Sequence, residues 1–594
     1  MLLEHITSPA DVKQLDSHDL PALCQEIRRA ILTSSAAAGG HIGSNLGTVE
    51  LTVALHRVFD SPHDKLIFDV SHQTYTHKML TGRAAYYLQP ELFGALSGFS
   101  NPDESEHDLF SMGHTSTSVS LAAGVAKARD LAGDSYNVIA VIGDGSLSGG
   151  LAFEGFDSLA ELGTNIIVII NDNGWSIAEN HGGIYHNLSK LRATKGRASN
   201  NIFSALGLDY RFVENGNDED AVERALAEVK DIDHPVVLHV CTVKGEGYAP
   251  AEGDAENWHH VGPFDIDHPD AAGAASVDDA AEATSYAELT GRHLLRRMEQ
   301  DPTVVAISAA TPYIMGFTAE RRRVAGPQFV DVGIAEEHAV TYSTGLAATG
   351  AKPVLGLYGV FMQRAYDELW HDLCLNSSPA TIIDFGASVR GTADATHLGF
   401  FDLALMGALP NLLCLAPVCR EEYLAMLDWA IDQTDRPVVI RVPSGNAQSR
   451  PDLAPKAGAT FATAAYHIAH HGSQVAILAL GGFYELGEQV ARALAAHHID
   501  ATLIDPRHAT DLDHAALDAL PDSHSVAITL EDGVLEGGWG EKVARYLGPS
   551  GMRVKSYGIH KGFPDRFDAD ELLTANGITV EDITSTVLSL LNRS

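Results

Sequence analysis

The chain has 594 residues, of which 45% are hydrophobic and 20% charged, a composition typical of globular proteins. Its formal net charge of −38 argues against nucleic-acid or anionic-membrane partners, because both need clustered Lys and Arg. No uninterrupted apolar run approaches the roughly 18 residues of a membrane span. The length predicts several domains, since single cores stop growing at roughly 250–300 residues.

The chain has an odd number of cysteines, and none shows the CxxC spacing of a metal or redox site. This usage indicates reduced thiols in a cytosolic protein. The first twenty residues lack the basic and apolar regions of a signal peptide, so we expect a cytoplasmic protein. The cysteines are Cys24, Cys241, Cys374, Cys414 and Cys419.

Short apolar strands alternate with helical patterns along residues 1 to about 265. We expect these strands at Lys65–Val70, Val138–Ile142, Ile166–Ile170 and Pro235–Val240. A stretch that is low in large apolar residues, His268–Ala283, then predicts a linker.

The same alternation continues in two further blocks. In the second block we expect strands at Val304–Ser308, Pro353–Leu357, Thr381–Ile383, Leu412–Leu415 and Val438–Val442. In the third we expect strands at Gln474–Leu480, Thr502–Ile504 and Val526–Thr529, and a closing helix at Val580–Leu591. The pattern predicts parallel sheets covered by helices on both faces, in three doubly wound α/β domains at residues 1–267, 284–448 and 457–594.

Residues 138–175 carry the clearest site pattern. One apolar run ends in GDG at 143–145, and the next ends in NDN at 171–173. In a parallel sheet, adjacent strand ends and the intervening helix N-terminus lie on one rim, where anionic ligands bind. Asp144 and Asn173 are then placed to hold one Mg²⁺, which takes few protein ligands. An ordinary βαβ unit is the plainer interpretation, but the spacing resembles the thiamine diphosphate motif.

An acidic pair in the second block is the next candidate. The run DVGIAEEHAV at 331–340 places it where an apolar stretch gives way to a helix. A carboxylate there often only completes a helix N-terminus. Thiamine chemistry offers Glu336 a sharper role, because the aminopyrimidine of the cofactor needs a carboxyl group hydrogen-bonded to a ring nitrogen. The upstream diphosphate pattern favours this second role.

Three histidines lie in Gly- and Ser-rich turns of the first block, namely His41, His72 and His114. Small neighbours let the backbone approach a ligand closely. Imidazole suits proton transfer around a carbonyl group, because its pKa lies near neutrality. They are not a zinc set, since no Cys or His lies at finger-like spacing. We expect them at the site.

Nearly the whole chain resembles the 1-deoxy-D-xylulose-5-phosphate synthase family of the transketolase superfamily. The matching runs include HIGSNLGTVELTVALH, HKMLTGR, GHTSTS, VGIAEEHAV, FMQRAYDELWHD and ATHLGFFDL, besides GDG and NDN. The resemblance implies a transferase of isoprenoid biosynthesis that condenses pyruvate with glyceraldehyde 3-phosphate and releases CO₂. It also implies thiamine diphosphate and Mg²⁺, a homodimer, and a diphosphate-binding, a pyrimidine-binding and a transketolase C-terminal domain in that order.

The resemblance also assigns residues. It implies that Asp144, Asn173 and the carbonyl of Trp175 bind Mg²⁺. It implies that Glu336 is the pyrimidine carboxylate and that Phe361 stacks on that ring. Near the cofactor it places His72, His114, Ser116, Gly143, Gly145 and Ser146. Catalytic or pocket roles fall to His41, His72, His259, His397, Tyr358 and Arg364.

Several positions depart from the family's pattern. Two arginines that typically grip the acceptor's phosphate are replaced by Phe385 and Ser444, and Gly253 stands where a lysine is expected. The Asp expected four residues before a site histidine is Ala393, with Asp394 one step closer.

Loss of the two arginines is expected to change how tightly the acceptor binds. A charge-assisted hydrogen bond contributes about 1.5–3 kcal/mol, so this loss predicts an affinity lower by two or more orders of magnitude unless another cation substitutes. Arg390 or Arg441 is the candidate substitute. The alternative is a pocket rebuilt around Phe385 for a smaller or unphosphorylated acceptor.

We therefore hypothesise an intact donor half and an altered acceptor half. The rivals are a transketolase that transfers a ketol group without CO₂ release, and an acyl-transferring 2-oxo acid dehydrogenase component that needs a lipoyl partner. A catalytically dead relative kept as a binding partner is a further alternative, against which the retained Asp144, Asn173 and Glu336 argue.

Overall fold

The computed structural model describes residues 1–269, 285–391 and 393–592 of the chain. Most of the predicted linker His268–Ala283 lies outside the described residues. The chain forms two compact units, Met1–Asp278 with Gly333–Ala335, and Asp279–Val332 with Glu336–Ser594. Within the described residues, no helix combines the length and hydropathy needed to cross a membrane.

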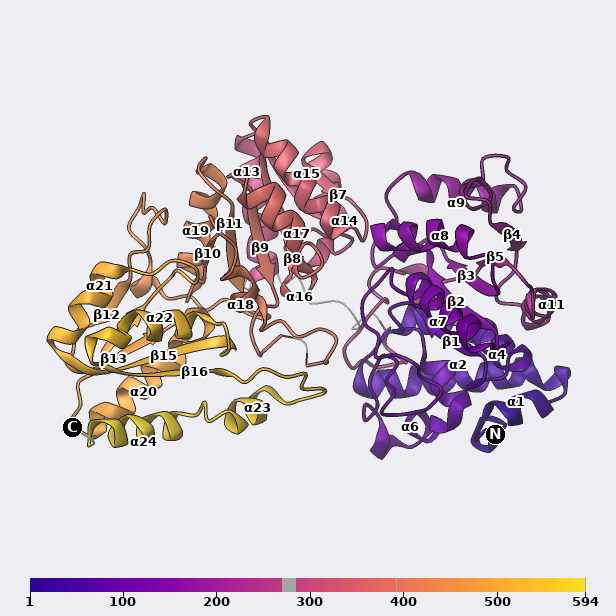
Figure 1. Cartoon of the computed structure of the whole chain (residues 1–594), viewed down its shortest axis with the longest axis horizontal. Coiled ribbons are helices and arrows are strands. Elements are labelled where there is room, and N and C mark those ends of the chain that lie inside the picture. Colours follow the sequence, from indigo (N-terminus) through magenta and orange to yellow (C-terminus); the bar gives the residue numbers. More distant parts are fainter. Residues whose placement is uncertain (270–284, 392, 593–594) are drawn as a thin grey trace. The chain divides into compact units, whose positions relative to one another are not determined.

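The first unit is built on a five-stranded parallel sheet in the order β1-β2-β3-β5-β4 (Figure 1). Its strands are β1 (Lys65–Phe68), β2 (Val138–Gly143), β3 (Ile166–Asp172), β4 (Asp209–Val213) and β5 (Pro235–Cys241). Its helices are α1 (Pro9–Gln14), α2 (Leu20–Ala38), α3 (Ile42–Gly47), α4 (Val49–Val58), α5 (Tyr75–Lys78), α6 (Ala85–Leu88), α7 (Ser118–Ala132), α8 (Gly150–Leu162), α9 (Gly183–Ala193), α10 (Ile202–Ala205), α11 (Glu219–Val229) and α12 (Ala249–Gly253).

Helices cover both faces of this sheet, because alternate residues of a strand point to opposite sides. Val138, Ala140 and Ile142 of β2 pack in a core with α7, α8 and α9. Ile139 and Val141 of the same strand pack in a second core with α4 and α11. The strand is therefore apolar throughout, as a strand buried on both faces requires.

The second unit contains two sheets. The first is parallel, in the order β10-β11-β9-β8-β6-β7, and the second has the order β12-β14-β13-β15-β16. Strands of the first are β6 (Val304–Ser308), β7 (Phe329–Asp331), β8 (Lys352–Tyr358), β9 (Thr381–Phe385), β10 (Leu413–Leu415) and β11 (Val438–Val442). Strands of the second are β12 (His467–His470), β13 (Gln474–Ala479), β14 (Thr502–Asp505), β15 (His524–Val534) and β16 (Arg553–Ile559).

The helices of this unit lie between and beside these strands (Figure 1). They are α13 (Tyr286–Gln300), α14 (Ala319–Ala325), α15 (Glu336–Ala348), α16 (Gly359–Met362), α17 (Tyr366–Glu368), α18 (Asp402–Met406), α19 (Arg420–Asp432), α20 (Tyr484–Ala496), α21 (His514–Ala519), α22 (Trp539–Leu547), α23 (Ala569–Ala575) and α24 (Val580–Leu591).

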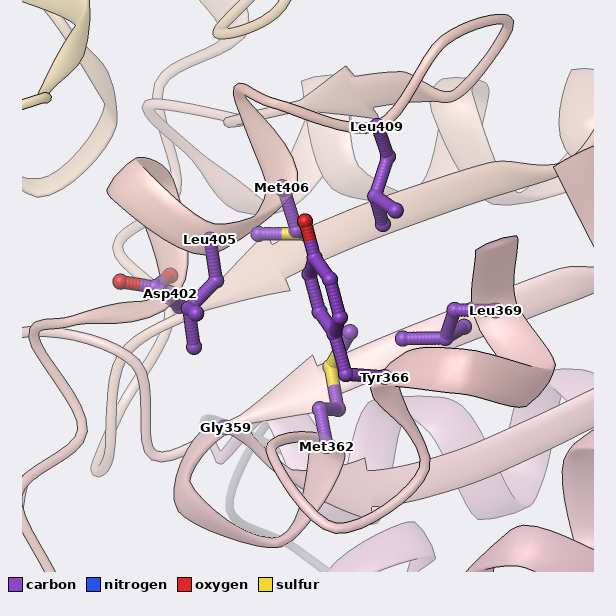
Figure 2. A pocket seen from close by; sticks show the side chains of 8 residues that line it. All are labelled: Gly359, Met362, Tyr366, Leu369, Asp402, Leu405, Met406 and Leu409. Atoms are coloured by element: carbon purple, nitrogen blue, oxygen red, sulfur yellow. The ribbon is translucent and has the colours of Figure 1, made fainter. Parts of the chain in front are cut away.

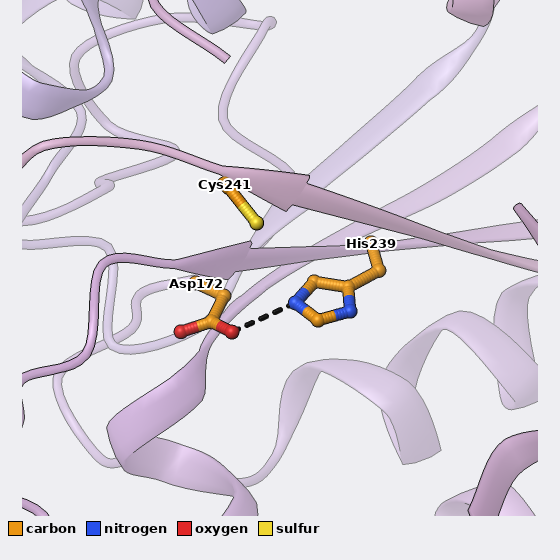
Figure 3. Close-up of side chains that lie close together, drawn as sticks. All are labelled: Asp172, His239 and Cys241. Carbon is orange, nitrogen blue, oxygen red and sulfur yellow. Dashed lines mark hydrogen bonds and ion pairs between the residues drawn. The ribbon is translucent and has the colours of Figure 1, made fainter. Parts of the chain in front are cut away.

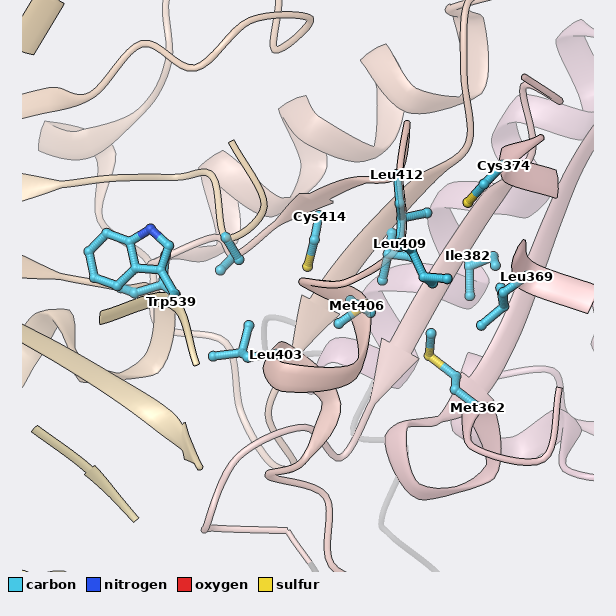
Figure 4. Packing of buried hydrophobic residues seen from close by; sticks show 14 of the residues in the cluster. Met362, Leu369, Cys374, Ile382, Leu403, Met406, Leu409, Leu412, Cys414 and Trp539 are labelled. Atoms are coloured by element: carbon cyan, nitrogen blue, oxygen red, sulfur yellow. The ribbon is translucent and has the colours of Figure 1, made fainter. Parts of the chain in front are cut away.

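One buried cluster joins the two sheets of the second unit (Figure 4). It runs from Met362 and Leu369, beside the first sheet, through Met406 and Cys414 to Trp539 at the start of α22. Burial of Met362 and Leu369 anchors the segment that carries Phe361 and Arg364, two predicted site residues.

The predicted strands of all three blocks are confirmed, with ends that shift by a few residues. Four strands were not predicted: β4, β7, β12 and β16. The expectation of purely parallel sheets is wrong at one edge, because β12 pairs antiparallel with β14. The boundaries of three domains stay a prediction.

Candidate active site

The ends of β2 and β3 bring the GDG and NDN runs together in the first unit. Gly143 pairs with Asn171 in the parallel register, so the residues that follow them lie on the same rim of the sheet. The Asp144 carboxylate accepts hydrogen bonds from the Asn173 amide at 3.4 Å, the Gly174 amide at 3.1 Å and the Asn180 side chain at 2.7 Å. Asn173 Oδ1 in turn accepts from the Trp175 amide at 3.1 Å.

Asp144 is a buried carboxylate with no cation of its own among the described contacts. It is 1% exposed, and burial, with the neighbouring Asp172 carboxylate, raises its pKa to about 8. Arg192 pairs with Asp172 rather than with Asp144. A divalent cation at this point would remove the electrostatic cost of ionising Asp144, and carboxylate and amide oxygens are the ligands that Mg²⁺ takes.

Small residues let the loop after Asp144 pack closely against neighbouring segments. A Cβ on Gly145 would lie 2.8 Å from Ser176 Oγ, and one on Gly149 would lie 2.1 Å from Ser116 Oγ. Ser116 adopts a φ of 71°, which is uncommon for a residue other than glycine, and its hydroxyl donates to the Ser146 carbonyl at 2.8 Å. The turn at Ser116 is therefore in direct contact with the loop after Asp144, and both carry residues predicted to lie near the diphosphate.

Asp69, which directly follows β1, supports that turn and was missed from the sequence. Its two carboxylate oxygens accept from the amides of Ser116, at 2.8 Å, and Ser118, at 2.9 Å. Asp69 thereby ties the start of α7 to the end of β1. A lone Asp after a strand gives no signal of this role, because the partners lie 47 and 49 positions away.

A histidine cluster forms the second part of the site in this unit. The His41 ring centroid lies 5.1 Å from that of His72, 5.6 Å from that of His259 and 4.6 Å from that of His260. Asn45 holds the first two together, since its Nδ2 donates to the carbonyls of His41, at 2.6 Å, and His72, at 2.7 Å. Asn45 and His260 were not singled out in the sequence.

His259 and Lys244 link the histidines with the Asp144 loop. Burial, together with the charges of Lys244 and His72, lowers the pKa of His259 well below its ordinary value, so the ring is neutral at pH 7. Lys244 donates to the Ser176 carbonyl at 2.7 Å, and burial lowers its pKa to about 8. His114 lies half-buried two residues before Ser116.

Glu336 is the first residue of α15 in the second unit, where it is 3% exposed. Burial raises the pKa of Glu336, and the guanidinium of Arg364, 3.3 Å from Oε2, opposes the rise. The structure thus brings together two residues that the sequence separates by 28 positions. A buried carboxyl of raised pKa is suited to donate a hydrogen bond.

Three further predicted residues form an aromatic row beside α16. The Phe361 ring lies 5.5 Å from that of Tyr358 and 5.8 Å from that of His397, both edge-on. His397 Nδ1 lies 2.8 Å from Thr396 Oγ1. Although burial opposes it, hydrogen bonding to His397 and Thr396 lowers the pKa of Asp394, so this displaced Asp still supports the histidine.

A small apolar pocket is lined by residues of α16, α17 and α18 and their neighbours (Figure 2). Asp402 is its one charged lining residue among the described residues, and that carboxylate pairs with Arg441. The remaining lining is Gly359, Met362, Tyr366, Leu369, Leu405, Met406 and Leu409. Such a lining does not suit a phosphorylated substrate, and we assign it no role.

The expected substitutes for the missing arginines behave differently. Arg441 is 2% exposed and is enclosed by Asp402 and Asp532, with which it forms ion pairs. The expectation that Arg441 compensates is therefore wrong, because its charge is already neutralised inside the protein. Arg390 has a side chain that is 55% exposed and pairs with the exposed Asp570 at 2.5 Å.

The two replaced positions are also distinct in the structure. Phe385 is 5% exposed and packs in the core under the first sheet of the second unit. It therefore fills core volume more than it lines a pocket. Ser444, which follows β11, lies beside Gly386. Gly253 is exposed at the end of α12, where no charged side chain replaces the expected lysine.

Models of known protein families match three successive parts of the chain. The family model described as 1-deoxy-D-xylulose-5-phosphate synthase matches residues 3–199. The models of the transketolase pyrimidine-binding domain and the transketolase C-terminal domain match residues 282–449 and 465–583. The chain thus has the transketolase-like α/β fold.

Curated relatives share its full length. The 1-deoxy-D-xylulose-5-phosphate synthase 2 of Geobacter sulfurreducens is 37% identical, with 100% of each chain covered. The synthase 1 of the same organism is 38% identical over 95% of this chain and 93% of its own. The synthase of Symbiobacterium thermophilum is 37% identical over 100% of this chain and 95% of its own. The chain belongs to the 1-deoxy-D-xylulose-5-phosphate synthase family.

Proposed function

We propose that this protein is a thiamine diphosphate-dependent transferase of isoprenoid biosynthesis. It decarboxylates pyruvate and joins the remaining two-carbon unit to glyceraldehyde 3-phosphate, which yields 1-deoxy-D-xylulose 5-phosphate and CO₂. The full-length relatives, each named for synthesis of this product, support the assignment over a transketolase or a dehydrogenase component. The observation that carries it is Glu336, a buried carboxyl of raised pKa at the start of α15.

We propose residues 1–267, 284–448 and 457–594 as the diphosphate-binding, pyrimidine-binding and C-terminal domains. In the first, Asp144, Asn173 and the Trp175 carbonyl hold Mg²⁺, while Gly143, Gly145, Ser146, Ser116, His72 and His114 lie around the diphosphate. The buried carboxyl group of Asp144, which a neighbouring divalent cation would make easier to ionise, supports this fit.

Glu336 and Phe361 hold the pyrimidine end of the cofactor. Thiamine diphosphate supplies a carbon that adds to 2-oxo acids and an electron sink for their decarboxylation. The protonated carboxyl of Glu336 donates a hydrogen bond to a ring nitrogen, and Phe361 offers a flat face to that ring. Arg364 orients Glu336 through the contact at Oε2.

The histidines transfer protons to and from the substrates. Imidazole nitrogens of His41 and His72 are suited to exchange a proton with an oxygen of the donor or the new hydroxyl. His259 stays neutral and keeps positive charge low around them. We propose that His397 and Tyr358 exchange protons with the acceptor. We also propose that Arg390 binds the acceptor's phosphate.

We propose a cytoplasmic homodimer. The five cysteines are all free, which suits a reducing compartment. Trp370 and Leu375 are 39% and 73% exposed on one short stretch of the second unit, and exposed apolar side chains of this size are common where a second subunit docks.

The test is a reaction with pyruvate labelled at its carboxyl carbon, thiamine diphosphate, Mg²⁺ and glyceraldehyde 3-phosphate. We expect labelled CO₂ in equal amount to 1-deoxy-D-xylulose 5-phosphate, identified by mass. A ketol transferase would release no labelled CO₂. A dead relative would bind no thiamine diphosphate in calorimetry with Mg²⁺, and either result would refute the proposal.

A further inference from the structure

Three potential metal ligands converge at the carboxyl ends of β3 and β5 (Figure 3). Asp172 is the last residue of β3, and Cys241, the last of β5, is its direct partner in the parallel register. His239 precedes Cys241 by two residues and so points to the same face of β5. A carboxylate oxygen, a ring nitrogen and the thiol sulfur all lie within 4.8 Å of one another.

The geometry needs only a small adjustment to take a tetrahedral ion. Ligands bound to Zn²⁺ at about 2.0–2.3 Å lie roughly 3.3–3.8 Å apart. His239 Nε2 lies 2.7 Å from Asp172 Oδ2, so this pair must open by less than about 1 Å. The imidazole is already oriented, because its Nδ1 lies 2.8 Å from the Tyr210 hydroxyl, the kind of second contact that metal-bound histidines make.

The donor set selects for a soft or borderline ion. A thiolate and an imidazole favour Zn²⁺ over Mg²⁺, whereas the Asp144 loop offers oxygen ligands alone. The carboxylate and the thiolate supply two negative charges, and the imidazole binds in its neutral form. Asp172 and His239 are fully buried, and Cys241, half-buried, leaves an approach for the ion.

We propose that Asp172, His239 and Cys241 form a binding site for a thiophilic divalent cation such as Zn²⁺, distinct from the Mg²⁺ site. Binding forms three metal–ligand bonds. The Cys241 thiol proton leaves to solvent, and the proton on His239 Nε2 moves to Nδ1, which then donates to the Tyr210 oxygen. Arg192 keeps its ion pair with the other oxygen of Asp172.

This cation site is coupled to the loop of the proposed Mg²⁺ site. The Gly174 amide donates to both Asp172 Oδ1, at 3.2 Å, and Asp144 Oδ2, at 3.1 Å. An ion that pulls on Asp172 therefore shifts the loop that carries Asn173 and Trp175. We expect Zn²⁺ to weaken binding of Mg²⁺ and thiamine diphosphate, a consequence that rests on the proposed function, whereas the metal site itself does not.

The first experiment uses Co²⁺ as a spectroscopic probe on the full-length chain in excess Mg²⁺. We expect a thiolate-to-cobalt charge-transfer band that saturates at one Co²⁺ per chain and disappears when Zn²⁺ is added. Cys241→Val should abolish the band, and His239→Gln should weaken Co²⁺ binding at least 10-fold. Cys374→Ala, which removes a thiol from the other unit, should leave the band unchanged.

Two results would overturn the site: no band in the parent chain at excess Co²⁺, or an unchanged band in a folded Cys241→Val variant, with folding checked by circular dichroism. The coupling has its own readout, calorimetry of thiamine diphosphate with and without Zn²⁺. We expect Zn²⁺ to lower the affinity at least 5-fold in the parent chain and not in Cys241→Val. Failure of the parent chain to bind thiamine diphosphate at all would instead refute the proposed function.

Discussion

Two rims can be compared: that of the sheet in the first unit, and that of the parallel sheet in the second unit, here called the second rim. They differ in how their buried charged groups are paired. At the first, Asp144 is buried and forms no ion pair among the residues that the structure describes. At the second, the one buried arginine of β11, Arg441, is already neutralised by Asp402 and Asp532. The first rim offers a buried carboxyl group to a cationic ligand, whereas the buried arginine at the second rim is already paired with carboxylates of the protein.

This difference indicates that the chain departs from its family's pattern at the acceptor-binding positions. The residues that we propose for the cofactor and the 2-oxo acid are present in the sequence, while the two positions expected to grip the acceptor's phosphate hold Phe385 and Ser444. Because Phe385 is buried in the core, the replacement removes a cation without building an apolar pocket in its place. We propose that the exposed Arg390 recognises the acceptor.

The largest expected effect is at Glu336. Glu336→Gln keeps the volume but removes the acidic proton, and we expect kcat to fall about 10²–10⁴-fold, the usual contribution of a positioned acid or base. Steady-state CO₂ release measures it. Glu337→Gln, one residue further along α15, is the matched control and should retain near-parental kcat. Equal loss in both variants would assign Glu336 a structural role only.

Asp144→Asn tests the rim of the first sheet. We expect the affinity for thiamine diphosphate in Mg²⁺ to fall by about 100-fold, because the variant removes the charge that the divalent ion needs. Calorimetry measures the affinity, and Asp157→Asn on the exposed face of α8 is the control. Tight, Mg²⁺-independent binding by the Asp144 variant would contradict the assignment.

Arg390 tests the rim of the second sheet. Arg390→Gln should raise KM for glyceraldehyde 3-phosphate about 10-fold, the lower end for a charge-assisted hydrogen bond at an exposed site, and leave unphosphorylated glyceraldehyde unaffected. Asp570→Asn, which releases Arg390 from its ion pair, should lower the same KM slightly. An unchanged KM in both variants would exclude Arg390 from phosphate recognition.

The smallest effect is a shift in pH dependence. Burial raises the pKa of Glu336, so activity that needs its proton is present below the raised pKa and lost as pH rises through it. Arg364→Gln removes the positive charge that opposes this rise, so the alkaline decline of kcat should move upward by roughly one unit. A downward shift in the kcat–pH profile would contradict this account.

Much of the fold could be predicted from sequence because its central strands are apolar on both faces, as in β2 and β3. The four strands that escaped prediction all lie at the edges of sheets. In β4, four of five residues are partly exposed, and β12 has two exposed residues among four. Neither strand shows a continuous apolar run. In addition, β12 is held by antiparallel pairing with β14, which no local sequence pattern indicates.

The residues of the candidate site also divide into those that the sequence indicated and those that it did not. Residues next to strand ends, such as Asp144 and Glu336, were predicted because motif and position coincide. Asp69, Asn45 and the enclosure of Arg441 were not, since each role depends on at least one partner far along the chain. Asp532, for example, lies 91 positions from Arg441. Sequence patterns indicate which residues reach the rim, whereas only the packed structure shows which charges are already neutralised.

One measurement tests the contrast between the two rims most directly. The purified protein, with thiamine diphosphate, Mg²⁺ and pyruvate, is offered glyceraldehyde 3-phosphate and glyceraldehyde at equal concentration, and the products are separated by mass. We predict a predominance of 1-deoxy-D-xylulose 5-phosphate that falls toward parity in Arg390→Gln. Equal use of both aldehydes by the parent chain, or a preference for glyceraldehyde, would contradict the account.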